Sequence, residues 1–485
     1  MSEGVVQVRI GGSEIPEEAR IQRLDGTERI HELFDFRLIV AAPASAGLDA
    51  AKLLGSEVTL RFERDGVLER AVVGMVSEVD DLAETEATTR RMRLRVMPRE
   101  FRMTLVATQE VYLDRSVPEI FAEKLALAGL ADALVLRLAK SYPKKEFVTQ
   151  YKESDLAFVS RLLEHEGLSY FFEYDADEDR ACVVLTDHNG GFTTPEHAEV
   201  EFHGRGETRG IFELAAEHRL TPAVCVVQDY NYRTALLDLT AQADVEGGFG
   251  GGVVEYGSHH KTPEEGSALA RIRAEEQRAK QLVYVGKTTH SHVGAGMRLS
   301  ITGHTGLGDL DVLVTEVRHH VEQIAFGTET ETGPYVATFH AIPRDRAYRP
   351  ERRTPRPRIY GIVNAIIDDA RRSDDRYAQI DPDGRYIVKL LYDTADSSGR
   401  LASRWVRMAQ PHAGPDYGMH FPLKPGAEVL LAFIDGDPDR PIIVGAVPNP
   451  ITRSPVDAAS NTVNRIKSAS GILIEYGDRR LSSKS

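Results

Sequence analysis

The feature that most constrains this chain is a run of short apolar segments between residues 404 and 447. The segments Trp405–Ala409, Glu428–Ile434 and Pro441–Val447 are rich in apolar and β-branched residues, and residues that favour turns separate them. Their apolar positions follow no helical period. The region therefore predicts strands of an antiparallel sheet or of a small barrel.

The connection between the last two segments, Asp435–Pro441, predicts a hairpin loop. Its Asp-Gly pair accommodates left-handed backbone dihedrals, and its prolines fix φ and cannot donate to a ladder. The spacing Asp-Gly-Asp-Pro-Asp also resembles the start of a calcium-binding loop. An EF-hand needs glycine at its sixth position and glutamate at its twelfth, whereas this chain has Arg440 and Ala446 there. We therefore interpret the segment as a turn.

Several short motifs, which occur in one order with short gaps, resemble the VgrG family of type VI secretion spike proteins. They are WVR-x-AQ at 405–410, AG-x-x-YG at 413–418, the segment Pro422–Val429 and GDPDRPII-x-G at 436–445. Much earlier in the chain, YKESDLAFVSRLLEHEG at 151–167, with YFF shortly after it, resembles the same family. The resemblance thus spans most of the chain, and through that family it extends to the hub and spike of contractile phage tails.

Composition argues against several functions. The net charge of -15 at pH 7 and the pI of about 5.6 disfavour binding to duplex nucleic acid, because neutralising phosphates requires a surplus of lysine and arginine. Cys182 and Cys225 have no Cys-x-x-Cys spacing, which predicts reduced core thiols. The N-terminal Met-Ser-Glu-Gly lacks the form of a signal peptide, and no apolar run has membrane-spanning length. We expect a soluble cytoplasmic product without a cleaved signal.

Residues 1–195 predict a first hub β-barrel region with an αβ insertion. Within the insertion, Ser116–Glu119 has the form of a capping box, and the helix that follows would bury Ile120, Phe121, Leu125 and Leu127. Ser154 caps a second helix that Gly167 ends, and Tyr170 then begins a strand. Before the insertion, alternating apolar residues predict strands, although this period does not separate a barrel from a sandwich. These strands are expected at 5–10, 34–40, 58–62, 74–76 and 92–96.

Residues 196–343 predict a second hub β-barrel region. The resemblance implies two similar barrels per chain and a ring of pseudo-sixfold symmetry when three chains assemble. A glycine-rich loop at 247–252 and a helix near Ala268–Lys280 interrupt the strands. The strands are expected at Val224–Tyr232, Met297–Ile301, Val312–Val317 and Tyr335–Ile342.

The remaining chain predicts a linker, an OB-fold domain and the start of a needle. Residues 344–358 form a linker rich in proline and arginine, which we expect to be solvated or to connect domains rather than to dock on an acidic neighbour. Residues 359–450 carry five or six short apolar runs, which suit an OB-fold barrel. For residues 451–485, the resemblance implies a linker and the first turns of a triple-stranded β-helix.

No catalytic, cofactor or metal site is predicted. The adjacent histidines at 259–260 and 319–320 would point to opposite faces of a strand, so neither pair suits one ion. A glycan hydrolase using Glu164 and Glu166 is a rival, but residues 450–465 are too few to hold a lysozyme domain between barrel and needle. Single-stranded nucleic acid on Trp405 is another, although a lone tryptophan in an apolar strand more often serves packing.

The prediction is therefore a mainly β protein with some helix, made of tandem barrel-like hub domains, an OB-fold barrel and the start of a trimeric β-helix needle. The resemblance implies a homotrimer that caps a hexameric Hcp-like tube, holds a PAAR-type tip protein, joins baseplate components and carries effectors, without nucleic acid. A phage-tail or extracellular injection-particle spike is the near alternative. An OB-type glycan or nucleic-acid binder is the distant one. The residues expected to serve structure or interfaces are Trp405, Arg407, Tyr417, Gly418, Gly426, Asp437, Pro438, Asp439, Ile472, Ile474 and Tyr476.

Overall fold

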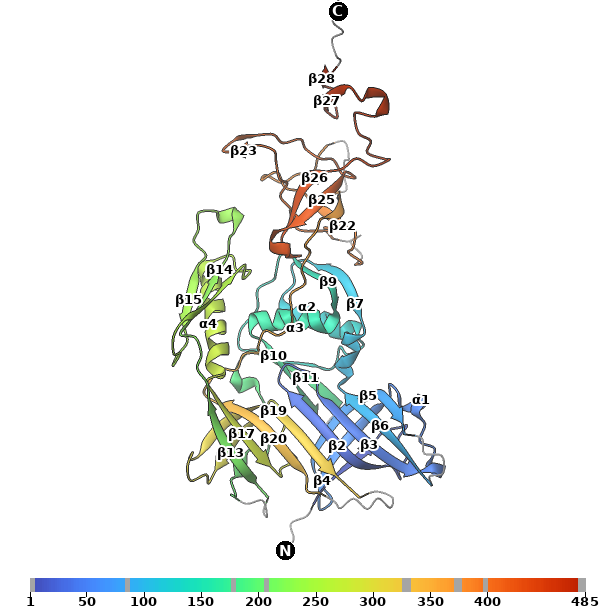
Figure 1. The fold of residues 1–485 in the computed structure, drawn as a ribbon, viewed down its shortest axis with the longest axis vertical. Coiled ribbons are helices and arrows are strands. Elements are labelled where there is room, and N and C mark those ends of the chain that lie inside the picture. Colours follow the sequence, from blue (N-terminus) through green and yellow to red (C-terminus); the bar gives the residue numbers. More distant parts are fainter. Residues whose placement is uncertain are drawn as a thin grey trace, which may run out of the picture. The chain divides into compact units, whose positions relative to one another are not determined.

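The chain forms two compact units in a computed structural model that describes residues 5–82, 88–175, 180–204, 209–324, 333–369, 377–395 and 400–478. The N-terminal Met-Ser-Glu-Gly, on which the expectation of no signal peptide depends, lies outside the described residues. Unit 1 comprises Met1–Val106, Val117–Tyr142 and Ser154–Pro355, and unit 2 comprises Ala107–Ser116, Pro143–Glu153 and Arg356–Ser485 (Figure 1). Unit 2 therefore takes two segments from the first half of the sequence.

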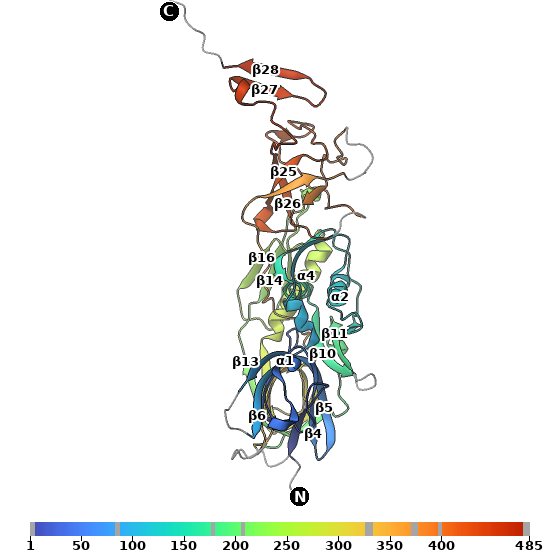
Figure 2. The same ribbon diagram turned by 90° about the vertical axis from the view of Figure 1, so that its right-hand side faces the viewer.

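Unit 1 is built on one twelve-stranded sheet. The strand order is β1-β4-β5-β6-β3-β2-β19-β20-β17-β13, with β18 pairing β19 and β12 pairing β18. In Figure 2 the strands β4, β5 and β6 are seen nearly end-on and lie around one ring of strands. The strands are β1 (Val6–Gly11), β2 (Arg20–Arg29), β3 (Asp35–Pro43), β4 (Glu57–Arg64), β5 (Val67–Asp81), β6 (Thr89–Met97), β12 (Glu199–Glu201), β13 (Ile211–His218), β17 (Leu282–Thr288), β18 (Arg298–Thr302), β19 (Leu310–Glu322) and β20 (Val336–Pro343). The short helix α1 (Ala50–Leu53) precedes β4.

The two predicted hub regions share this sheet. Strand β2 pairs antiparallel with β19, from Arg29 opposite Glu316 to Arg23 opposite Glu322. Burial alternates along the strands, as the period of two requires, so that one continuous apolar core receives side chains from both regions. The two regions are therefore one folding unit with a common core.

The side chain of Gln323 closes the gap between β1 and β2, which do not pair directly. Its Nε2 donates to the carbonyls of Val8 and Ile21, both at 3.0 Å, and its Oε1 accepts from the Val8 amide at 2.6 Å. One amide group thus satisfies three backbone groups at the seam. Such groups would be costly to leave unpaired.

The αβ insertion agrees closely with its sequence pattern. Helix α3 (Asp155–Glu166) starts at Ser154, whose Oγ accepts from the Ala157 amide, and ends at Gly167 with φ 71°. Its partner is α2 (Val117–Leu127), where the prediction that Leu127 is buried is wrong, since this last residue of the helix is exposed. A three-stranded sheet, in the order β10 (Ser169–Asp175), β11 (Arg180–Thr186), β8 (Leu134–Arg137), completes the insertion.

A small subdomain of unit 1 packs helix α4 (Pro263–Ala279) on a three-stranded sheet. Strand β14 (Val224–Gln228) lies between β15 (Ala241–Asp244) and β16 (Gly252–Tyr256). The helix starts earlier than predicted, because Thr262 caps it and a proline occupies its first turn. The strand predicted to reach Tyr232 ends at Gln228, and His259 and His260 lie in a loop, where the opposite-faces argument does not apply.

The segment 344–355 is docked on unit 1, so the expectation that it is solvated is wrong for these residues, although the segment does lead from unit 1 to unit 2. Arg349 donates to the carbonyl oxygens of Gly167 (3.0 Å) and Asp187 (2.7 Å) and pairs with Glu275 at 2.7 Å. Further along, Arg352 and Arg353 pair with acids of unit 1. Counting charge along the sequence could not reveal these acids, because they come from distant elements.

Unit 2 is a small barrel with a four-stranded sheet in the order β22 (Val388–Leu390), β21 (Val363–Ile367), β25 (Glu428–Phe433), β26 (Pro441–Ala446). The predicted strand at Trp405–Ala409 is replaced by isolated bridges, because the backbone there pairs with Tyr386 through Val406 and then with Ile443 through Met408. The inserted segments contribute β7 (Ala107–Tyr112) and β9 (Val148–Ser154), which pair with each other as a two-stranded ribbon. A two-residue pair, β23 (Ala413–Gly414) and β24 (Tyr417–Gly418), forms a further hairpin.

The last described elements form a hairpin of β27 (Val463–Lys467) and β28 (Leu473–Gly477). The prediction that this segment pairs between chains did not anticipate that its strands pair with each other. All five residues of β28 are exposed, including Ile474 and Tyr476. The triple-stranded needle expected here remains a prediction, and the final LSSKS lies outside the described residues.

Candidate functional site

The loop between β25 and β26 holds the ribbon of β7 and β9 to the barrel of unit 2. Asp435 (φ 55°) and Gly436 (φ 67°) take the left-handed conformation that the sequence predicted. This turn aims two carboxylates at other parts of the unit. Asp439 Oδ1 accepts from the Thr149 amide at 2.6 Å, and the Pro438 carbonyl accepts from the Thr149 hydroxyl at 3.4 Å.

Asp437 stabilises the same loop from within. It is 3% exposed, its Oδ1 accepts from the Asp439 amide at 3.0 Å, and its Oδ2 pairs with Arg356 at 3.0 Å. The Gly436 carbonyl accepts from the Ile359 amide at 2.7 Å. The loop therefore binds the start of the OB region on one side and the inserted ribbon on the other. Within unit 2 its acids serve as hydrogen-bond acceptors.

A second loop holds the other strand of the ribbon. Asp393 Oδ1 accepts from the Val111 amide at 3.3 Å, and the Thr394 amide donates to the Gln109 carbonyl at 2.8 Å. Burial raises the pKa of Asp393 above its ordinary value, against opposing contributions from the Ala395 amide and Arg400.

Apolar packing completes the attachment. Val111 and Phe147, both from the inserted segments, are buried in the same core cluster as Ala365, Val429 and Leu431 of the barrel. The core of the OB region is thus assembled from three separate stretches of chain. We did not predict β7 or β9. In β7, apolar Val111 follows two polar residues, which is only a weak strand signal.

The other residues predicted to serve structure or interfaces occupy two settings. Trp405 and Arg407 are partly buried on the bridged segment, and Gly426 (φ 85°) forms the turn before β25. Tyr417 and Gly418 lie exposed on the β23–β24 hairpin, and Ile472, Ile474 and Tyr476 are exposed at the C-terminal hairpin. Asp437, Pro438 and Asp439 thus lie on one loop, whereas Tyr417 and Gly418 lie on the β23–β24 hairpin and the last three residues at the C-terminal hairpin.

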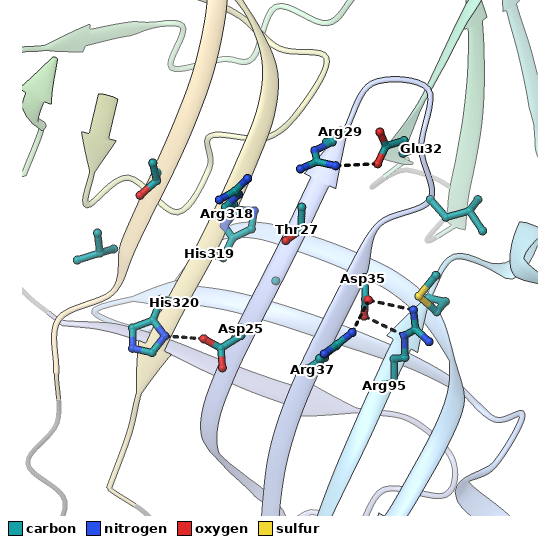
Figure 3. A pocket seen from close by; sticks show the side chains of 15 residues that line it. Asp25, Thr27, Arg29, Glu32, Asp35, Arg37, Arg95, Arg318, His319 and His320 are labelled. Carbon is teal, nitrogen blue, oxygen red and sulfur yellow. Dashed lines mark hydrogen bonds and ion pairs between the residues drawn. The ribbon is translucent and has the colours of Figure 1, made fainter. Parts of the chain in front are cut away.

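On unit 1, a pocket of about 790 Å³ lies on the charged face of the sheet, over β2, β3, β6, β19 and β20 (Figure 3). Its acids are paired with bases across the strands. His320 Nδ1 lies 2.7 Å from Asp25 Oδ1, and Nε and Nη2 of Arg95 donate to the two carboxylate oxygens of Asp35 at 3.1 and 3.0 Å. Nearby, Arg29 pairs with Glu32 at 3.1 Å.

The electrostatics of the pocket favour ionised groups in fixed pairs. Burial by itself would raise the pKa of Asp25, but hydrogen bonds from Arg23 and His320 lower it below its ordinary value. A general acid for glycan cleavage needs the opposite, a carboxyl group whose pKa is raised. The lowered pKa of Asp25 therefore does not suit this carboxyl group to the role of a general acid.

On the inner side of the same strands lies a buried polar network that sequence analysis missed. Glu28 contacts Arg70 at 2.6 Å and His319 at 3.0 Å, and His319 Nδ1 lies 2.6 Å from the hydroxyl of Tyr335. Burial opposes ionisation of Glu28, but the charge of Arg70 and the hydrogen bond from His319 outweigh it and lower the pKa of Glu28 to about 2. The network links β2, β5 and β19 inside the core.

Two family profiles match the chain. The profile described as "Phage tail baseplate hub (GPD)" matches residues 27–325, and the one described as "Type VI secretion system/phage-baseplate injector OB domain" matches residues 377–447. The matches fall on unit 1 and unit 2 respectively, apart from the ribbon segments.

Individual proteins give the same picture. Two type VI secretion system spike proteins of Pseudomonas aeruginosa, VgrG1c and VgrG1a, are each 26% identical over 97% of this chain. The chain spans 66% of the first relative's length and 74% of the second's.

Solved structures share the fold. The E. coli c3393 protein, described as a type VI component similar to T4 tail proteins gp27 and gp5, has a TM-score of 0.67 at 23% identity and covers 90% of this chain and all of its own. The Francisella PdpA-VgrG complex contains a chain with a TM-score of 0.63 at 9% identity, covering 98% of this chain and 83% of its own.

Proposed function

The baseplate hub profile matches more than half of this chain, which therefore belongs to the phage tail baseplate hub family, and on that basis we propose a function. We propose that the chain is the hub and spike base of a type VI secretion machine. The observation that carries the proposal is the order of the two matches, a hub followed by an injector OB domain, within one chain. The Pseudomonas relatives favour the type VI machine over a phage tail or an extracellular injection particle.

The proposed working form is a homotrimer, with the hub regions at 1–195 and 196–343 forming a ring and the OB domain at 359–450 on the axis. Uncovered apolar side chains on unit 2 support it, since patches of this kind mark contact surfaces. Tyr360, Tyr417 and Phe421 are each more than half exposed. The exposed hairpin β27–β28 would pack against the same hairpin of the other two chains, because an isolated two-stranded hairpin is at best marginally stable in water. Residues 451–485 would in this way form the start of the needle.

The proposed mechanism is mechanical and requires no catalysis by this chain. The trimer would cap a hexameric tube, hold a tip protein at the needle end, attach to baseplate components and carry effectors. The complex of PdpA with a VgrG protein of the same fold supports the binding of further proteins. None of the described helices combines the length and apolarity needed to cross a membrane. We propose that the protein assembles in the cytoplasm and is then expelled by the machine.

Solution mass tests the trimer. Light scattering at several concentrations should give about 161 kDa, three times the 53.7 kDa chain, as for a closed homo-oligomer. Ile474→Lys should raise the concentration at which the assembly dissociates by about tenfold or more, because it places a charge in the apolar contact. Ile324→Lys, at an exposed isoleucine of unit 1, is the matched control and should leave it unchanged. A strict monomer at all concentrations would contradict the proposal.

A further inference from the structure

The chain passes between its two units five times, after residues 106, 116, 142, 153 and 355. A domain on a simple linker would need a single passage. We propose that the ribbon of β7 and β9 is a mechanical clasp that keeps unit 2 attached to unit 1 when the two are pulled apart. That a pulling force acts between the units rests on the proposed function, whereas the clasp itself is a property of this chain.

The ribbon is bound within unit 2 along both of its strands. On β9, the Thr149 backbone and side chain both bind the β25–β26 loop, through Asp439 and Pro438. On β7, Gln109 and Val111 bind the loop at 393–394. Hydrogen bonds to a carboxylate are about twice as strong as neutral ones. The bond from the Thr149 amide to Asp439 is therefore the strongest of these hydrogen bonds between the ribbon and the rest of unit 2.

The apolar core adds a second, independent hold. Val111 and Phe147 are 4% and 6% exposed and lie among the barrel residues of unit 2. Drawing the ribbon out would return both side chains to water and leave a void behind. The free-energy cost of removing such side chains from a packed core is large. Extraction therefore has to break the hydrogen bonds and the core together.

The passages after residues 106, 142 and 153 are also anchored close by on the unit 1 side. The Val106 carbonyl accepts from the Asp155 amide at 2.9 Å, and Ser154 caps helix α3. Tyr142 donates from its hydroxyl to Asp187 at 3.1 Å. Little free chain is therefore available to lengthen before the bonds within each unit bear the load.

The fifth passage is held in the same way. Thr354 donates through its amide (3.0 Å) and its hydroxyl (2.7 Å) to Glu164 of unit 1. Two residues later, Arg356 pairs with Asp437 in unit 2. A force between the units is thus divided over five connections, four of them anchored in this way, and unit 2 should not detach until the ribbon leaves its core.

Force spectroscopy on the full chain tests the clasp. Handles are attached to cysteines introduced by Ser267→Cys on α4 and Ile451→Cys after β26, which are both exposed, with one labelled chain per assembly. The native Cys182 and Cys225 are buried. The measured quantity is the lifetime of the attached state of unit 2 at constant force.

Asp439→Ala should shorten this lifetime about tenfold or more, because it removes a charge-assisted hydrogen bond. Asp439→Asn keeps an acceptor oxygen and should restore most of the lifetime. Ile443→Val, which trims the same core at a residue of β26 rather than of the ribbon, is the control for general destabilisation and should change the lifetime less than about threefold at matched thermal stability. If Asp439→Ala does not fold, Val111→Ala carries the same expectation.

An unchanged lifetime in Asp439→Ala, or in Val111→Ala where that variant replaces it, would overturn the clasp. So would equal shortening in Ile443→Val. The clasp would also be overturned if unit 2 of the unmodified chain detached at low force and left the ribbon behind on unit 1. These outcomes are separate from the oligomer test, because a monomeric chain would contradict the spike proposal and still allow this measurement.

Discussion

His31 should make unit 1 sensitive to acid, and the size of the effect follows from its setting. The imidazole is 7% exposed, packs on the Tyr170 ring at 4.6 Å and lies 3.8 Å from Glu164. Burial lowers its pKa from an ordinary value of 6.5 to about 4, against a smaller opposing contribution from the Ser160 backbone. In the unfolded chain, His31 is expected to titrate near its ordinary value.

The sign follows from proton linkage. Between pH 6.5 and about 4 the unfolded state binds a proton at His31 that the folded state does not bind, so the free energy of unfolding decreases as the pH decreases. One pKa unit corresponds to about 1.4 kcal/mol, so His31 should contribute a loss of about 2 kcal/mol between pH 6.5 and pH 5. Burial raises the pKa of the neighbouring Glu164, which acts in the opposite direction. A His31 variant is therefore needed to isolate its share.

His31→Asn is the appropriate perturbation. His31 has φ 68°, and asparagine tolerates this left-handed conformation without carrying a titratable group. Urea unfolding followed by circular dichroism at pH 7.5 and pH 5.0 gives the difference in free energy for each protein. Trp405, the only tryptophan, lies in unit 2 and reports that unit separately by fluorescence.

The variant should lose about 2 kcal/mol of the pH dependence, even if it is less stable at both pH values. Val40→Ala, a fully buried core position of β3, is the control that destabilises without altering titration. If His31→Asn and the unmodified chain show the same difference between the two pH values, the assignment to His31 is refuted.

Three further changes test the packing of unit 1. Lys124→Met removes the ammonium group that faces Asp155 at 2.9 Å between α2 and α3, and should cost about 3–5 kcal/mol of stability in urea unfolding, as for a broken buried pair. Gly26→Ala would place a methyl group 2.3 Å from the Phe36 ring and should cost about 1–3 kcal/mol, measured in the same way; a neutral result would contradict the close approach. Gln323→Met should release the seam between β1 and β2, seen as faster hydrogen exchange in both strands, and unchanged exchange would show that the seam holds without it.

The elements that sequence predicted well are those fixed by local chemistry. Helix α3 runs from its Ser154 cap to Gly167 as expected, since capping and left-handed glycine are properties of a few adjacent residues. The hairpin of β25 and β26 with its Asp-Gly turn follows for the same reason. Alternating burial along β3 and β4 likewise needs only the period of two.

The errors arose where distant partners decide the outcome. The arginines of 344–355 looked solvated because their acids, such as Glu255 and Glu275, are far away in sequence. The run at Trp405–Ala409 looked like a strand because its composition is apolar, yet its backbone changes partners partway along. Asp437 and Asp439 were correctly placed in a turn, but their hold on Arg356 and Thr149 could not be read from the turn itself.

The sequence by itself determined the mainly β class, the helices of the insertion, the turn chemistry of the OB region and the resemblance of the chain to spike proteins, because motifs and periods are written in neighbouring residues. Only the tertiary structure decided that both hub regions share one sheet through β2 and β19, and that residues 107–116 and 143–153 belong to unit 2. The reason is physical. Strand pairing and core packing join any segments whose edges and apolar faces fit, and the energy of that fit depends on the folded neighbour rather than on the distance along the chain.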